Sequence, residues 1–341
     1  MDDVVLVVSP AHDLHAQGVI SVLRRSHGAA VYQLDMQAFP RAASASFSID
    51  ADDGDLAHSE WRGPDGILHL DRVKSVWWRR PHGAEIARLF TGVDHGQFVQ
   101  TECDHFLQGL LWSRRCLWVN DPMNNLRASR KIVQLARARD AGLTLPATLI
   151  TNDPAEARNF VESLPGRAIF KRTGAGPGPA SKTSFVTADI VRRLESIVDS
   201  PTTFQSYVDA ALDLRVIWID GELWTVSIDS QAGVSPEDSR FDNSVAFEPY
   251  ALPRSVADRL GTLMSDLGLV YGAIDLRLGV DGEFYFLEVN PAGQFVYLEL
   301  KTGLPIMAAL ASVLARGTVG GKQSHYRGDG DAMAVPQALS S

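Results

Sequence analysis

The sequence predicts a mixed α/β and α+β fold, with an α/β domain at the amino-terminal end and α+β units after it. Apolar strands alternate with helical segments in the first part of the chain, and two Asp-Gly turns between apolar strands lie in the second half. A length of 341 residues is enough for two or three domain-sized units. Hydrophobic residues make up 45% of the chain and charged residues 21%, which is typical of a globular protein.

Residues 1–119 are predicted to form the amino-terminal α/β domain around a parallel sheet. Short apolar runs bounded by loops predict its strands, and apolar residues at helical spacing predict its helices. The predicted strands are 4–8, 31–34, 73–78 and 117–119, and the predicted helices are 15–27 and 97–112. Residues 41–66 are rich in Ala, Ser, Asp and Gly, which predicts a loop or an irregular edge hairpin.

Residues 120–200 are predicted to form a second lobe. Residues 126–141 have the spacing of a single amphipathic helix, which Gly142 ends, and Asp153-Pro154 opens another helix. Strands are expected at 147–151 and 168–171. The stretch GAGPGPASKTS follows, and its glycines and prolines predict a loop.

Residues 201–317 are predicted to form a third unit that contains both hairpins. The expected strands are 202–208, 214–219, 222–229, 272–280 and 284–289, with helices at 255–267 and at the end of the unit. Residues 318–341 are Gly-rich and polar and have no hydrophobic period, so we expect a disordered tail.

The charge balance excludes two classes of partner. A formal net charge of −9 argues against nonspecific nucleic-acid binding and against an anionic membrane surface. The opening MDDVVLVVSP lacks the features of a signal peptide, and no apolar run is long enough to cross a bilayer, so a cytoplasmic location is expected. Cys103 and Cys116 have no metal-ligand spacing and are expected to be free thiols.

A candidate metal site lies on the last hairpin. Asp281-Gly282 is a hairpin turn, and folding the two strands together brings Asp275 opposite the end that carries Glu288 and Asn290. Glu288 and Asn290 are two residues apart and so point to the same face. Three oxygen donors on one face suit Mg2+, which keeps its other positions for phosphate and water. The alternative is a hairpin with an ordinary polar outer face.

Two lysines precede this hairpin and could bind phosphate. Lys171 ends a predicted strand directly before the glycine-rich loop, and Lys131 lies on the preceding helix. The helix-terminated phosphate loop with the pattern GxxxxGK[ST] is absent. Each lysine alone has a second interpretation as a solvated surface charge.

Asp213 and Arg215 alternate on one predicted strand and therefore share a face. The planar guanidinium of an arginine can bind phosphate or carboxylate through two parallel hydrogen bonds. An exposed surface pair is the alternative. The preceding segment, TTFQSYV at 202–208, is an extended strand whose backbone could serve as a hinge.

In this order, the motifs of residues 120–315 resemble those of the ATP-grasp superfamily. The resemblance implies an ATP-grasp fold with an amino-terminal Rossmann-like domain, the pre-ATP-grasp domain. It implies ATP between two lobes and two Mg2+ ions on Asp275, Glu288 and Asn290. It also implies catalytic roles for Arg215 and Lys171 in making an acyl phosphate from a carboxylate. The implied ATP-binding residues are Lys131, Lys171, Gln205, Ser206, Tyr207, Val208 and Asp213.

A narrower resemblance covers nearly the whole chain. SVWWRRP at 75–81, SIDSQ at 227–231 and FLEVNPAGQF at 286–295 are similar to the ATP-grasp maturases of ribosomally made peptides, the graspetide synthetases. Arg79 and Arg80 match that family's twin arginines and are implied to hold an acidic core peptide. Asp238 and Arg240 fall where an Asp-Trp-Arg motif is expected, with Ser239 in place of the tryptophan. Without the resemblance, Arg79-Arg80 is a solvated strand end.

The implied partner is a precursor peptide with a leader and a core of acidic, Thr, Ser and Lys residues. The implied products are rings closed by ω-esters or ω-amides. Residues 172–208 are the candidate segment for contact with the leader. A homodimer is the default expectation, because most soluble oligomers are symmetric dimers.

Two rival functions stay open from the sequence. An ATP-grasp ligase that joins free amino acids or small peptides would share all the nucleotide residues, and only SVWWRRP and SIDSQ argue against it. A nucleotide- or peptide-binding protein without ligase activity would not need the complete set of Mg2+ and phosphate residues.

Overall fold

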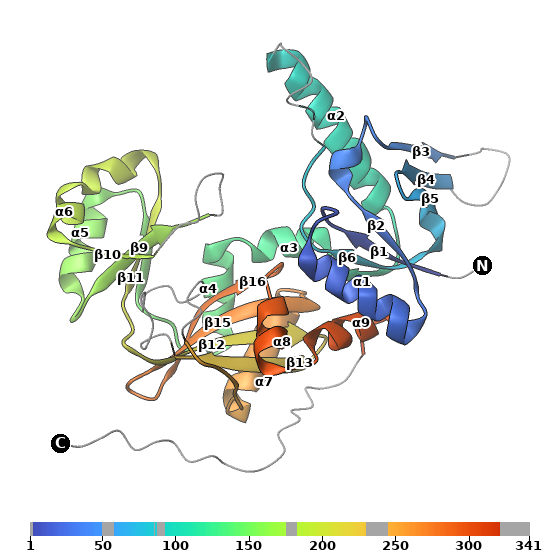
Figure 1. The fold of residues 1–341 in the computed structure, drawn as a ribbon. Coiled ribbons are helices and arrows are strands. Elements are labelled where there is room, and N and C mark those ends of the chain that lie inside the picture. Colours follow the sequence, from blue (N-terminus) through green and yellow to red (C-terminus); the bar gives the residue numbers. More distant parts are fainter. Residues whose placement is uncertain are drawn as a thin grey trace.

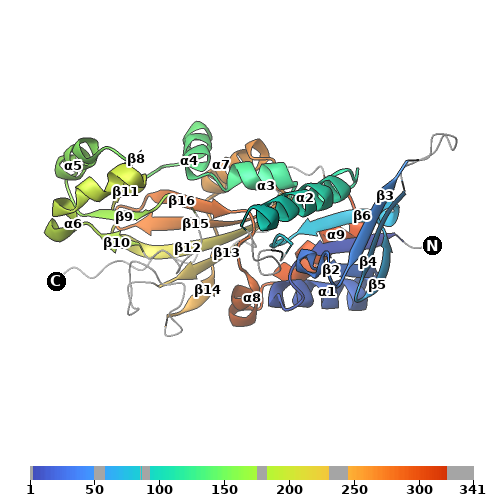
Figure 2. The same cartoon turned by 90° about the horizontal axis from the view of Figure 1, so that it is seen from above.

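The computed structural model describes residues 3–49, 58–84, 86, 93–174, 183–229 and 245–320. Figure 1 shows a large central sheet, with the amino-terminal sheet on one side of it and a smaller lobe on the other. The view from above in Figure 2 shows the same order. Within the described ranges, none of the helices combines the length and the apolar character that a transmembrane segment requires.

The amino-terminal sheet is parallel, as expected, and has the strand order β2-β1-β6-β7. Its strands are β1 (Val4–Val8), β2 (Ala30–Leu34), β6 (Val73–Trp78) and β7 (Leu117–Val119). Helix α1 (Leu14–His27) begins at Asp13, whose side chain accepts a hydrogen bond from Ala16 N, and ends at Gly28 in the left-handed conformation. It buries its apolar face against the sheet and α9 (Ile306–Arg316).

The segment expected to be a loop or irregular hairpin contains a three-stranded antiparallel sheet. Its strands are β3 (Ser44–Ser48), β4 (His58–Gly63) and β5 (Gly66–His69). Trp61 and Leu68 are paired across β4 and β5 and are buried under the amino-terminal sheet, which stabilises a segment of weak strand propensity. Short 3-10 helices η1 (Met36–Ala38) and η2 (Leu70–Arg72) flank this sheet, and α2 (Val93–Trp112) follows β6.

The helix expected at 126–141 is two helices. They are α3 (Pro122–Ala128) and α4 (Lys131–Asp140). Asp121 caps α3 by accepting hydrogen bonds from the backbone N–H groups of Met123 and Asn124, and Arg130 between the helices is extended. The break places Lys131 at the first position of α4, pointing toward the last hairpin.

The smaller lobe is built on an antiparallel sheet of order β10-β9-β11-β8. Its strands are β8 (Thr148–Thr151), β9 (Ala168–Arg172), β10 (Ser184–Phe185) and β11 (Thr202–Ser206). Its helices are α5 (Pro154–Ser163), which begins at Asp153 as expected, α6 (Ala188–Arg192) and the 3-10 helix η3 (Leu194–Asp199). Phe204 and Leu194 are in its separate apolar core.

The large sheet is antiparallel and has the order β14-β13-β12-β15-β16. Its strands are β12 (Ala210–Ile219), β13 (Glu222–Ile228), β14 (Phe247–Pro249), β15 (Tyr271–Gly279) and β16 (Phe284–Asn290). Helices α4 and α7 (Arg254–Asp266) cover one face, and α8 (Val296–Thr302) and α9 cover the other. The single helix expected at the end of this unit is two helices, α8 and α9. The first ends at Gly303, which has a φ of 73°.

The predicted domain boundaries fall between β7 and α3 and between η3 and β11, and they stay a prediction. Of the expected tail, residues 321–341 lie outside the described residues.

Candidate active site

The three oxygen donors predicted for a metal are brought together by β15 and β16. The antiparallel register pairs Asp275 with Glu288 and Ala273 with Asn290. All three donor side chains therefore share one face at the carboxyl end of β16, and all are half-buried. Asn290 Oδ1 also accepts a hydrogen bond from Ala292 N at 3.0 Å, which fixes the orientation of the amide.

Each of the two carboxylates is paired with a cation from another element. Arg215 on β12 lies opposite Asp275 and forms an ion pair with it. Lys131 Nζ at the start of α4 lies 2.9 Å from Glu288 Oε2. Burial lowers the pKa of Arg215, but the attraction of Asp275 and its hydrogen bond, together with Tyr297 and Tyr271, outweigh it, so the pKa is raised overall and the guanidinium stays charged.

Lys171 brings a third cation to the same place. Its Nζ donates to Gln205 Oε1 at 3.1 Å. Burial, and after it the charge of the neighbouring Lys131, lower the pKa of Lys171 to about 8, and Glu288 opposes the shift. Three cations around two carboxylates leave an excess of positive charge, which suits an anionic ligand such as a polyphosphate.

A narrow cavity opens beside Lys171, between the small sheet and the large sheet. Gln205, Ser206, Tyr207 and Val208 line it, as does the apolar side chain of Leu287. The remaining lining residues are Pro146, Ile169, Lys171, Thr183 and Arg277. A cavity with apolar walls and a few polar groups, adjoining a cationic cluster, has the composition expected for a nucleotide base next to its phosphates.

Asp213 pairs with Arg277 beside the narrow cavity, and its contact with a nucleotide stays a prediction. Its carboxylate accepts two hydrogen bonds from Arg277, from Nε at 2.6 Å and from Nη2 at 2.9 Å. Arg277 in turn donates to Val208 O at 3.2 Å and lies 5.5 Å from the centroid of the Tyr207 ring. Asp213 thus orients Arg277 against the 205–208 segment.

Sequence reasoning missed Arg277, although a signal for it was present. The tripeptide Asp-Leu-Arg occurs at 213–215 and again at 275–277. Because β12 and β15 run antiparallel, each aspartate of one copy faces the arginine of the other.

Arg79 is buried, so it is not a solvated strand end, and its role in peptide binding stays a prediction. Its side chain is only 1% exposed. Its Nη1 donates to Ala292 O and, at 3.3 Å, to Gly293 O, and its Nε lies 3.5 Å from Asp13 Oδ2. Burial lowers the pKa of Arg79. The residue therefore braces the loop that follows Asn290. Arg80 is half-buried and donates to Ala292 O at 3.3 Å; its role in peptide binding stays a prediction.

Further residues that sequence reasoning missed hold the same loop. Tyr271 OH donates to Gly293 O at 2.8 Å, and Asn120 Nδ2 donates to Pro291 O at 3.0 Å and to Tyr271 O at 2.9 Å. Burial raises the pKa of Tyr271 to about 12, so its hydroxyl keeps the proton that it donates. A Cβ on Gly293 would clash with the Cβ of Ala273, so only glycine allows this close approach.

The donor set fits magnesium. Among the described residues, no group of three or more His, Cys, Asp or Glu side chains could hold a metal ion. Two carboxylates and one amide are fewer donors than a closed protein cage requires, and they match the Mg2+ preference for sites completed by phosphate and water.

Two predicted features cannot be placed. Asp238 and Arg240 lie outside the described residues, as does most of the glycine-rich segment, at 175–182.

The whole chain resembles solved structures of peptide-modifying enzymes. No protein-family model and no curated protein matches it. The macrocyclase MdnC of Microcystis aeruginosa MRC, solved with the precursor peptide MdnA, is 27% identical, with a TM-score of 0.80 over 92% of this chain and 99% of that one. The macrocyclase MdnB of the same organism is 29% identical, with a TM-score of 0.75 over 92% and 99%. The ATP-grasp ligase PsnB, solved with a minimal precursor, Mg and ADP, is 25% identical, with a TM-score of 0.75 over 92% and 96%.

Proposed function

We propose that this chain, an enzyme with the fold of the ATP-grasp ligases, closes rings in a precursor peptide at the expense of ATP. An Asp or Glu side chain of the peptide is phosphorylated to an acyl phosphate. A Thr or Ser hydroxyl, or a Lys amine, of the same peptide then attacks the acyl carbon and releases phosphate, which leaves an ω-ester or ω-amide.

The cationic cluster beside the narrow cavity is the observation that carries this proposal. Phosphoryl transfer passes through a loose transition state, so it depends on positioning and on neutralising charge. Lys131 and Lys171 would bind the phosphates of ATP, and Arg215 would stabilise the transferred phosphoryl group. Magnesium bound by Asp275, Glu288 and Asn290 would neutralise the phosphate oxygens.

The side chains that now pair with one another would change partners when a nucleotide binds. Lys131 and Arg215 neutralise Glu288 and Asp275 in this structure. A Mg2+–nucleotide complex supplies cations to the carboxylates and anions to the two basic groups. The electrostatic balance of the site is then kept while the basic groups turn to phosphate.

The 205–208 segment would bind the adenine in the narrow cavity, with Arg277 and Asp213 fixing its position. Ring closure within one peptide gains from proximity, because the attacking group is tethered to the activated one. Two Mg2+ ions, a leader on the precursor and a homodimer remain predictions from the resemblance.

The test is to incubate the enzyme with ATP, Mg2+ and the peptide encoded beside its gene, and to measure ADP and peptide mass. We expect ADP release that depends on the peptide, and the loss of one water for each ring. ADP release with a free amino acid in place of the peptide would favour a small-substrate ligase. Nucleotide binding without any ADP release would favour the binding protein. Either result overturns the proposal.

A further inference from the structure

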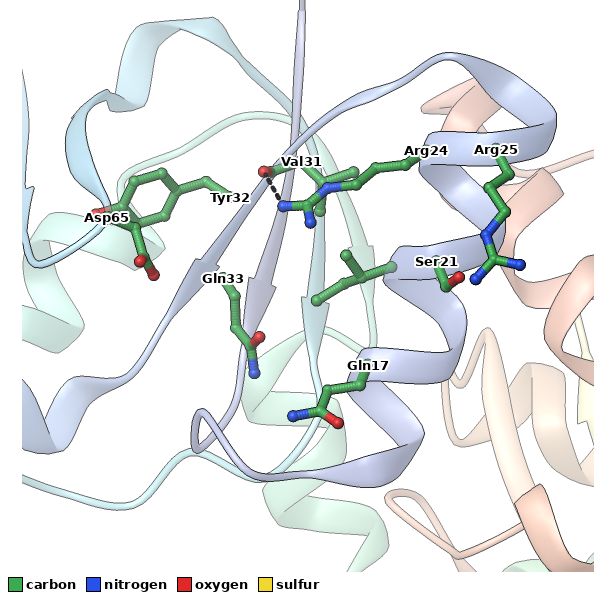
Figure 3. Close-up of a pocket in the computed structure, with 9 residues that line it drawn as sticks. Gln17, Ser21, Arg24, Arg25, Val31, Tyr32, Gln33 and Asp65 are labelled. Carbon is green, nitrogen blue, oxygen red and sulfur yellow. Dashed lines mark hydrogen bonds between the residues drawn. The ribbon is translucent and has the colours of Figure 1, made fainter.

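A second hollow lies on the amino-terminal domain, between α1 and β2. It has a volume of about 630 Å3, and Ile20 and Val31 form its apolar floor. Figure 3 shows Ser21, Arg24 and Arg25 reaching it from the helix and Gln33 from the strand. None of these residues takes part in the candidate active site.

The strand side of the hollow is an open sheet edge. β2 is the outermost strand of its sheet in the described part of the chain. Leu34 O accepts a hydrogen bond from Ser9 N, which directs the Leu34 backbone toward β1. Val31 O instead accepts from Arg24 Nη2 at 3.4 Å, so the Val31 backbone is directed away from β1. Since directions alternate along a strand, the Gln33 backbone also faces outward, and both residues can pair with an added strand.

The helix side of the hollow is positively charged. Arg24 and Arg25 are exposed, and neither forms an ion pair with another described residue. The chain as a whole carries a net charge of −9, so two adjacent arginines without acidic partners are a local exception. Asp65 lies at the opposite rim, so the hollow is positively charged on the helix side and negatively charged on the other.

The hollow and the candidate active site lie at the two ends of α1. Asp13, directly before the helix, contacts Arg79, which braces the loop after Asn290. From Asp13 to Arg24 the helix rises about 17 Å, at about 1.5 Å per residue. An extended peptide covers this distance with about five or six residues. One short segment can therefore connect the two places.

We propose that this hollow binds an acidic segment of the peptide substrate, which adds to the edge of β2 as a strand and directs its carboxylates to Arg24 and Arg25. The proposal rests on the proposed function for the identity of the peptide. Backbone pairing with an edge strand gives affinity, and the side chains that alternate along it give specificity.

A fluorescein-labelled peptide of alternating glutamate and threonine is a suitable probe, because alternation puts every glutamate on one face of a strand. Its affinity is measured by fluorescence anisotropy. Arg24→Ser/Arg25→Ser should weaken binding about tenfold, as two exposed ion pairs of ordinary strength predict. Arg139→Ser/Arg254→Ser removes the same charge elsewhere and should leave the affinity unchanged. A probe N-methylated at alternate residues should also bind more weakly, because it cannot pair with the strand edge.

Equal weakening by both double variants would overturn the proposal, since binding would then follow net charge alone. Full displacement by inorganic phosphate, together with no effect of N-methylation, would assign the hollow to small anions and would also overturn it. Binding of ADP with Mg2+ by Arg24→Ser/Arg25→Ser is measured in parallel and should be unchanged. If the peptide encoded beside the gene is never modified but the probe binds as described, the proposed ring-closing function is wrong and the proposed docking site is supported.

Discussion

Arg215 and Asp275 lie directly opposite each other on β12 and β15, and two residue pairs along the same strands the order is reversed, with Asp213 facing Arg277. The two ion pairs have different surroundings. The first pair includes one of the three predicted metal donors, whereas the second supports the segment that lines the narrow cavity. In the proposed function, the crossed arrangement would let one pair of strands position groups for both ends of a nucleotide.

Lys171→Met should abolish turnover without lowering the stability of the ligand-free enzyme. The pKa of Lys171 is lowered to about 8, mainly by burial, so its charge is unfavourable until an anion binds. We expect ATP-dependent turnover to fall at least about 100-fold, as for the loss of one transition-state contact, and the melting temperature to stay level or rise. Thermal unfolding and ADP release check both. A variant that melts clearly lower would show that Lys171 stabilises the fold.

Glu288→Gln should remove the magnesium dependence of nucleotide binding. The substitution keeps the shape of the side chain and deletes one of two carboxylates, leaving Lys131 without its 2.9 Å ion pair. We expect ADP affinity in the presence of Mg2+ to fall about tenfold or more, with stability lower by about 1 kcal/mol. Glu283→Gln on the exposed turn of the same hairpin is the matched control. Magnesium titrations of the two variants are followed by calorimetry. Identical curves would disprove the assignment of Glu288 as a magnesium ligand.

Gly293→Ala should weaken the metal site through the backbone. The added Cβ would clash with Ala273, next to Asn290, so the loop must shift. We expect a loss of about 2 kcal/mol in unfolding free energy, as for an overpacked core position, together with weaker binding of ADP and Mg2+. Gly166→Ala meets no atom within 4 Å and should cost little. Equal effects of the two substitutions would contradict the close packing.

Arg79→Met should weaken the binding of ADP and Mg2+ and leave peptide affinity unchanged. It removes hydrogen bonds to Ala292 O and Gly293 O, which position the loop after Asn290, and leaves these buried carbonyls unsatisfied. We expect the Mg2+ concentration needed for half-maximal ADP binding to rise, with stability lower by about 2 kcal/mol. Peptide affinity, measured without nucleotide, should be unchanged. Loss of peptide affinity alone would contradict this expectation and support the peptide-contact role that the resemblance implies.

His15→Gln should remove part of the acid sensitivity of folding. Burial, followed by the charge of Arg79, lowers the pKa of His15 to about 4 from an ordinary value of 6.5, with Asp13 opposing and Arg80 adding to the shift. Between these values the unfolded chain binds more protons than the folded one, so this contribution to stability is complete above pH 6.5 and is lost as the pH falls toward 4. The difference in unfolding free energy between the two proteins should shrink by about 1 kcal/mol over this range. If denaturant titrations give the same difference in unfolding free energy at every pH, His15 does not contribute to the acid sensitivity of folding.

Local sequence patterns predicted those parts of the fold that are determined by residues close together in the sequence. Alternation and an Asp-Gly turn were sufficient for the hairpin of β15 and β16, and with it for the meeting of Asp275 and Glu288. The fold class is confirmed by the solved structures. The break at Arg130 was missed, because helical spacing continues through it while the Arg130 backbone is extended.

The burial of Arg79 could not have been predicted from the sequence. The carbonyls that accept its hydrogen bonds are more than 200 residues away, so a strand end that is usually solvated becomes part of the interior only after the sheets have assembled. Trp61 and Leu68 are a similar case, since a segment of weak propensity is ordered by the core that it covers.

The anchoring of the 291–293 loop by Asn120, Arg79 and Tyr271 limits how the enzyme can be recombined with its relatives. In a chimaera that takes its first 119 residues from a homologue, the residue at position 79 would come from the homologue, and the 291–293 loop would come from this enzyme. Where the two do not fit, the loop would lose its anchor. Such hybrids should work only where Arg79 and the Pro-Ala-Gly turn are exchanged as one inherited unit.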